Sequence, residues 1–75
     1  MPYDPELSAL IEEFSQAIKE ESAAFDRLAA KTKAGAYDAE WRRLTGEVLE
    51  KGMRSSAVFA RIRELGELRA LENAA

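Results

Sequence analysis

Glutamate side chains are the best candidates for chemistry in this sequence, because it contains no histidine and no cysteine. Glu12, Glu13, Glu20 and Glu21 recur at helical spacing and could present carboxylates along one helix. General acid–base catalysis needs a group that titrates near neutral pH, and a di-iron centre needs Glu-x-x-His pairs from facing helices. The chain offers neither, and it has no glycine-rich phosphate loop and no loop of alternating Asp ligands for Ca²⁺. We therefore expect a protein that is not an enzyme, with no catalytic residues, metal site or cofactor.

A second group of candidate functional side chains lies within residues 27–43. It combines Tyr37 and Trp41 with five basic residues, which are Arg27, Lys31, Lys33, Arg42 and Arg43. Such a cluster could bind single-stranded nucleic acid by stacking and phosphate contact. However, Asp26, Asp38 and Glu40 lie among these residues, and the chain has a net charge of −3. A small regulator that binds nucleic acid, or a nucleic-acid-binding protein, through this basic turn is therefore the alternative function rather than the leading one.

Large apolar side chains in the second half of the chain are better candidates for partner binding. These are Tyr37, Trp41, Met53 and Phe59. Trp and Tyr often anchor interfaces because one end of each side chain is apolar and the other polar. The competing interpretation is that all four belong to the chain's own core. A chain of 75 residues has few large apolar side chains and needs most of them to form a core.

The elements that position these side chains are predicted to be helices. Asp4 can cap a first helix, Pro5 suits its first position, and Gly35 can end it. We expect this helix to cover residues 5–33. Its apolar stripe alternates steps of four and three and comprises Leu7, Ile11, Phe14, Ile18, Glu21, Phe25, Leu28 and Thr32. The pattern predicts that Phe14, Ile18 and Phe25 are buried.

Glu21 interrupts the stripe, and two explanations are open. It could be a polar contact or ion pair that sets the register of the facing helix. We favour the second explanation, in which the stripe curves out or the facing helix ends there, because a buried unpaired carboxylate is too costly.

Small side chains flank the stripe on both sides. One side consists of Ser8, Ser15, Ser22 and Ala29, and the other of Leu10, Ala17, Ala24 and Lys31. Small flanking side chains let neighbouring helices approach closely. A single facing helix would leave much of this largely uncharged surface exposed to solvent. This indicates self-association as a homodimer or other homo-oligomer, although Ala also occurs on solvated helix faces as a good helix former.

Residues 38–72 repeat the helical pattern with a polar interruption. Asp38 can cap a second helix, Gly52 can end it, and Ser55 or Ser56 can cap a third. We expect helices at 38–51 and 55–72, with one continuous but kinked helix over 38–72 as the alternative. The predicted fold is a single all-α domain (1–75), an antiparallel helical hairpin or small three-helix bundle. The halves also complement each other in charge, with net −6 over residues 1–26 and net +3 over residues 27–75.

The sequence contains no apolar run of membrane-spanning length and no recognisable signal peptide, so we expect a cytoplasmic protein without a membrane partner. In size and shape, a small acidic helical hairpin resembles several groups of bacterial adaptors and co-chaperones. This resemblance and the helical pattern lead to one expectation. The chain is a helical protein–protein interaction module, of the adaptor, co-chaperone or regulator type, that self-associates or docks a partner helix.

Overall fold

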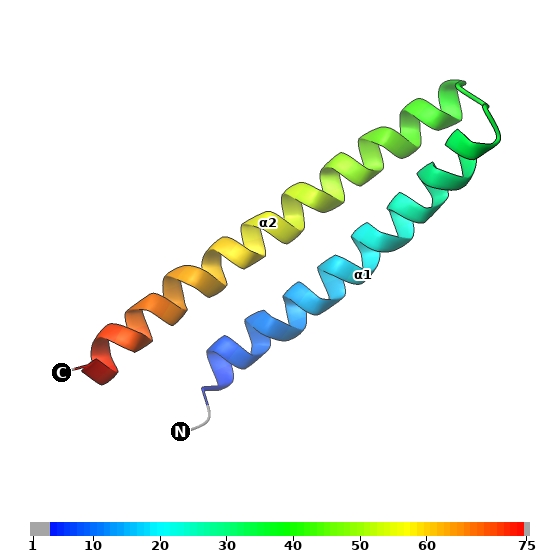
Figure 1. Cartoon of the computed structure of the whole chain (residues 1–75). Helices are drawn as coiled ribbons and strands as arrows, with labels where there is room; N and C mark the ends of the chain where they lie inside the picture. The colour runs from blue at the N-terminus through cyan, green and yellow to red at the C-terminus, as the bar shows by residue number, and fades with distance from the viewer. Residues whose placement is uncertain (1–3, 75) are drawn as a thin grey trace.

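Two long helices joined by a tight turn make up the part of the chain that the structure describes (Figure 1). The computed structural model describes residues 4–74, with α1 at Pro5–Lys33 and α2 at Ala39–Ala74. The helices run antiparallel, so the two ends of the chain lie at the same end of the hairpin (Figure 1). The all-α class is confirmed, and α1 has the predicted bounds.

The ends of α1 form as the sequence predicts. The Asp4 carboxylate accepts a hydrogen bond from the Leu7 backbone N–H at 3.1 Å, and proline occupies the first turn. At the other end Gly35 has φ of 69°, a left-handed conformation that a side chain would strain. This glycine lets the chain reverse, and Ala36 N–H then donates to the Lys31 carbonyl at 3.3 Å.

The second half of the chain is one helix, and the prediction of separate helices at 38–51 and 55–72 is wrong. Asp38 does cap α2, because its carboxylate accepts the Trp41 N–H at 3.0 Å. The helix then continues through Gly52, where an internal glycine costs only about 1 kcal/mol. Polar Lys51 and Ser55 occupy inward positions of α2, and α1 presents carboxylates opposite both of them. The polar interruption is therefore matched across the hairpin and does not end the helix.

The hairpin core is narrow and lies on a different edge of α1 from the one predicted. The most buried side chains are Leu10, Ala17 and Ala24 of α1 and Leu44, Ser55 and Val58 of α2. Phe14 is half-buried, whereas Ile11, Ile18 and Phe25 are 50%, 42% and 57% exposed. The prediction that Ile18 and Phe25 are buried is therefore wrong. A single facing helix covers one edge of the wide apolar surface of α1, and it covers the edge with small side chains.

The molecule is elongated, with extents of 57 × 16 × 14 Å and a radius of gyration of 17.1 Å. A compact domain of this length has a radius of gyration of about 11 Å. Among residues 4–74, no large side chain is fully buried. Neither helix in this range contains a segment long and apolar enough to cross a bilayer.

Candidate interaction surface

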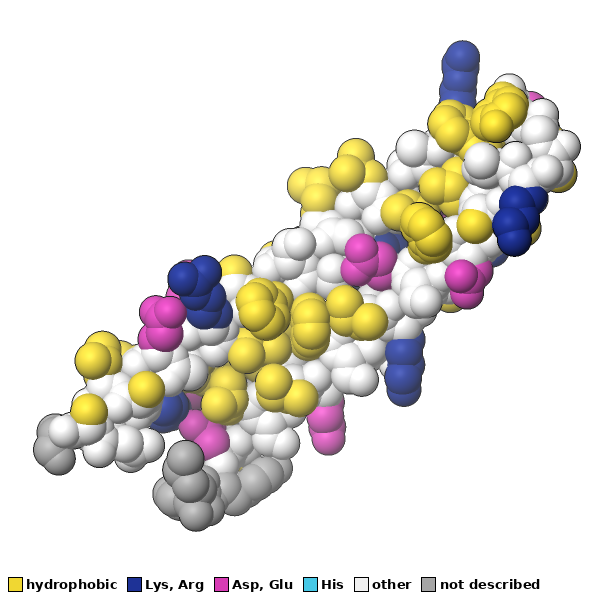
Figure 2. Space-filling view, in the orientation of Figure 1, with side chains coloured by type: hydrophobic (Ala, Val, Ile, Leu, Met, Phe, Trp, Pro, Cys, Tyr) yellow, Lys and Arg dark blue, Asp and Glu magenta, His cyan; other side chains and the backbone are white. Residues whose placement is uncertain are grey.

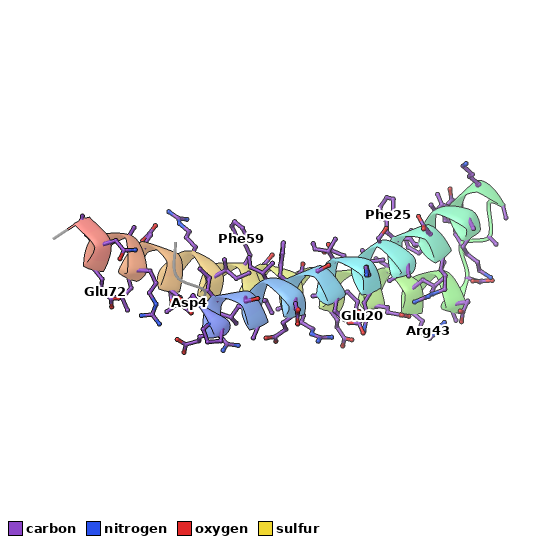
Figure 3. The ribbon with its side chains drawn as sticks, turned by 90° about the horizontal axis from the view of Figure 1, so that it is seen from below. Asp4, Glu20, Phe25, Arg43, Phe59 and Glu72 are labelled. Carbon is purple, nitrogen blue, oxygen red and sulfur yellow. The ribbon has the colours of Figure 1, made fainter. Side chains whose placement is uncertain are left out.

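The two broad sides of the hairpin differ in chemistry. We define the apolar face by eight residues: Ile11, Phe14, Ile18 and Phe25 of α1 and Val48, Leu49, Met53 and Phe59 of α2. Figure 2 shows hydrophobic side chains in patches over both helices. Figure 3 shows Phe25 and Phe59 projecting from one side of the hairpin, whereas Glu20 and Arg43 project from the other.

Two shallow depressions adjoin each other on the apolar face. The first is lined by Ile18, Glu21, Ser22, Phe25 and Val48. The second is lined by Glu21, Val48, Leu49, Gly52, Met53 and Ser56. Because Glu21 and Val48 line both, the depressions form one open groove across the two helices.

Aromatic contact joins the two helices toward their open end. The ring centroids of Phe14 and Phe59 are 5.5 Å apart and the rings are tilted by 44°. Tilted pairs at this distance are favourable. Phe59 remains 52% exposed, so the pair both links α1 to α2 and contributes to the apolar face.

Glu21 forms a polar contact within the apolar face. Ser55 Oγ donates to Glu21 Oε1 at 2.7 Å and also lies 3.0 Å from the Gly52 carbonyl oxygen. A Cβ atom at Gly52 would lie 3.2 Å from Glu21 Oε2, so the glycine leaves room for the carboxylate. The favoured prediction, that the stripe curves out or the facing helix ends at Glu21, is wrong. Instead α2 passes Glu21 and supplies a hydroxyl partner, as the polar-contact alternative requires.

The opposite side, which we call the charged face, carries ion pairs between the helices. Arg54 pairs with Glu20 at 2.6 Å, and Arg27 pairs with Glu47. At the open end of the hairpin, Arg69 bridges Asp4 at 2.9 Å and Glu6 at 3.0 Å. The pairs of Arg54 and Arg69 join basic residues of the second half to acidic residues of the first, in keeping with the charge difference between the halves, whereas Arg27 and Glu47 both belong to residues 27–75.

Hydrogen bonding changes the acid–base properties at both ends of the hairpin. The hydrogen bond from Arg69 lowers the pKa of Asp4, and the Leu7 N–H adds to this effect. The same contact raises the pKa of Arg69. Near the turn, the Trp41 N–H and then Lys31 lower the pKa of Asp38. These carboxylates are therefore held in their charged form as structural contacts.

The basic turn is interleaved with acidic side chains. Lys31 pairs with Asp38 at 3.1 Å, and Arg43 contacts both Glu40 at 2.5 Å and Glu47 at 3.2 Å. The Glu40 pKa is lowered, chiefly by the hydrogen bond from Arg43. Lys33 and Arg42 are exposed. The structure thus divides the five basic residues among carboxylate partners and solvent, and does not assemble one open cationic surface.

The four predicted partner-binding residues do not form a single cluster. Tyr37 and Trp41 lie near the turn with edge-on rings 5.6 Å apart, and Trp41 Nε1 donates to Thr32 Oγ1 at 3.0 Å. Trp41 is half-buried and Tyr37 is exposed. Met53 and Phe59 lie further along α2 on the apolar face and are exposed. The structure separates the turn aromatics from the central apolar surface.

Sequence reasoning assigned Ile18 and Phe25 to the core, so it missed them as surface residues. The signal for their exposure was the width of the uncharged surface of α1, which exceeds what one facing helix can cover. Within residues 4–74, no group of three or more acidic side chains is placed to hold a metal ion.

No family model, curated protein or solved structure matches this chain.

Proposed function

We propose that the protein is a non-enzymatic helical interaction module, of the adaptor, co-chaperone or regulator type, that works through its apolar face. One observation carries this proposal. Ile11, Ile18 and Phe25 are each at least 42% exposed on one side of the hairpin, whereas the ion pairs between the helices lie on the other. Soluble proteins rarely leave a contiguous apolar surface uncovered unless another molecule binds there.

The proposed mechanism is burial of a helical surface in the groove between α1 and α2. Ile18, Phe25 and Val48 line one part of this groove and Met53 the other. Ile18 and Phe25 are seven residues apart, and Leu49 and Met53 are four apart, so their spacing suits an incoming helix that presents apolar residues at three- and four-residue steps. We place this activity in the cytoplasm, because a chain without cysteine has no need of an oxidising compartment.

A pair of variants on α1 tests whether the apolar face is the binding surface. Ile18→Lys places a charge on the apolar face, and Gln16→Lys places the same charge at an exposed position outside it. We expect Ile18→Lys to lose the binding of every protein that the tagged wild-type chain retains, untagged copies of itself included. Gln16→Lys should retain them. Equal retention by the two variants would refute the apolar face as the binding surface.

A further inference from the structure

We infer that the molecule covering the apolar face is a second copy of this chain, related by a twofold axis, so that two hairpins form a four-helix bundle. This inference rests on the proposed function and specifies the partner of the same surface. Three properties of the surface lead to a second copy: its area, its charge and its shape.

The area matches what a dimer needs. The chain has an accessible surface of 5652 Å². A compact monomer of 8.3 kDa has about 4,600 Å², so the hairpin exposes roughly 1,000 Å² more than a globular chain of its mass. A standard stable interface buries about 800 Å² on each partner. Packing two hairpins through their apolar faces would therefore bury, on each hairpin, about as much accessible surface as the hairpin exposes in excess of a compact fold.

The charge of the surface favours a copy over a partner of opposite charge. The chain has a net charge of −3, so two copies would repel each other if the surface between them also carried an excess of negative charge. Over residues 7–32 of α1 and 46–60 of α2, the heptad rows of the apolar face contain one charged residue, Glu21, and its carboxylate already accepts a hydrogen bond from Ser55 of the same chain. Two such surfaces can meet without a direct like-charge contact at most positions.

The shape of the surface is suited to packing on itself. On α1, the large side chains Ile11, Ile18 and Phe25 lie beside a row of small ones, Ser8, Ser15 and Ser22. On α2, Phe59 lies one heptad from Gly66, where an added Cβ would meet no atom within 4 Å. A twofold interface joins the same patch on both subunits, so each patch must contain both projections and gaps. This surface contains both.

Sedimentation equilibrium from about 1 to 100 μM tests the inference with the unmodified protein. We expect a monomer–dimer equilibrium that reaches twice the 8.3 kDa chain mass. Ile18→Lys should raise the dissociation constant at least about 100-fold, because the twofold axis introduces the charge twice into one apolar interface. Gln16→Lys should match the wild-type chain.

A second measurement keeps the test valid if Ile18→Lys unfolds. Because the chain has no cysteine, Ile18→Cys and Gln16→Cys each introduce a single thiol. At 100 μM we expect a maleimide to modify the thiol of Ile18→Cys at least tenfold more slowly than that of Gln16→Cys. On dilution below the dissociation constant, the two rates should converge.

The outcomes separate this inference from the proposed function. A wild-type monomer at 100 μM overturns the second copy, but the interaction module survives if Ile18→Lys still abolishes the capture of another protein. A dimer whose mass is unaffected by Ile18→Lys, with equal thiol rates at the two positions, overturns the apolar face in both roles.

Discussion

Ser55 is among the most buried residues of the hairpin, and Glu21 is its partner across the helix pair. A buried hydroxyl without a hydrogen bond would destabilise the fold, and Ser55 avoids this penalty by donating to the Glu21 carboxylate, with the Gly52 carbonyl oxygen as a second acceptor 3.0 Å away. Gly52 belongs to the same contact, because its missing side chain leaves space beside Glu21 Oε2. A glycine that suggests a helix end in the sequence therefore serves to accommodate a carboxylate.

Alanine substitutions at two glycines of α2 test this role of Gly52. At Gly46 a new Cβ meets no atom within 4 Å, so Gly46→Ala should raise the free energy of unfolding by about 1 kcal/mol through helix propensity. At Gly52 the Cβ displaces Glu21, and Gly52→Ala should gain less than half as much. Urea unfolding with a common m-value measures both. Equal stabilisation would show that the close contact at Gly52 has no energetic consequence.

Removing the charge of Glu21 while keeping its shape tests the cost of covering this residue. Glutamine can still accept the Ser55 hydrogen bond, but no longer loses the hydration of a carboxylate when a second chain packs over it. Glu21→Gln should lower the dimer dissociation constant by about tenfold, which corresponds to about 1.4 kcal/mol. Sedimentation equilibrium measures the change. A weaker dimer would mean that the charge itself contributes to the interface.

At the scale of the helices, the ends of α1 and the start of α2 could be predicted because capping depends on local sequence. Asp4, Gly35 and Asp38 perform their predicted roles. The continuity of α2 could not be predicted in this way, because Lys51 and Ser55 look like a polar break until Glu20 and Glu21 are placed opposite them. The choice of core edge on α1 was also beyond the pattern, since four adjacent rows over residues 7–32 contain only two charged residues, Glu21 and Lys31, and one helix covers only part of them.

The ion pair of Arg69 with Asp4 connects α2 to the start of α1 at the open end of the hairpin. This contact predicts a contribution to stability that is lost in acid. The pKa of Asp4 is lower in the folded chain than its ordinary value of 3.8. The contribution of Asp4 to the free energy of unfolding is therefore complete above pH 3.8. It is lost as the pH falls through the lower pKa that Asp4 has in the folded chain. The melting temperature should fall with pH below about 4. Arg69→Met should show a shallower fall, as measured by circular dichroism, and a control variant, Arg63→Met, should follow the wild-type chain. Identical acid profiles for all three would count against the contact.

At the scale of the whole molecule, the hairpin is a long pair of helices whose two broad sides differ: one is the charged face and the other is the exposed apolar face. Ion pairs connect the helices on the charged face, while large apolar side chains remain exposed on the apolar face (Figures 2 and 3). A chain of this size buries little surface by itself, so its stability should depend on what covers the apolar face. The prediction of self-association from sequence rested on the same surface, although it assigned Ile18 and Phe25 to the core.

Small-angle X-ray scattering at about 100 μM tests the central claim most directly, because it reports mass and shape together. Side-by-side packing through the apolar face should double the 8.3 kDa mass and thicken the cross-section, with little increase over the 57 Å length of one hairpin. A particle with the mass of a single chain and the cross-section of one hairpin would contradict the account, as would a doubled mass in a particle nearly twice as long.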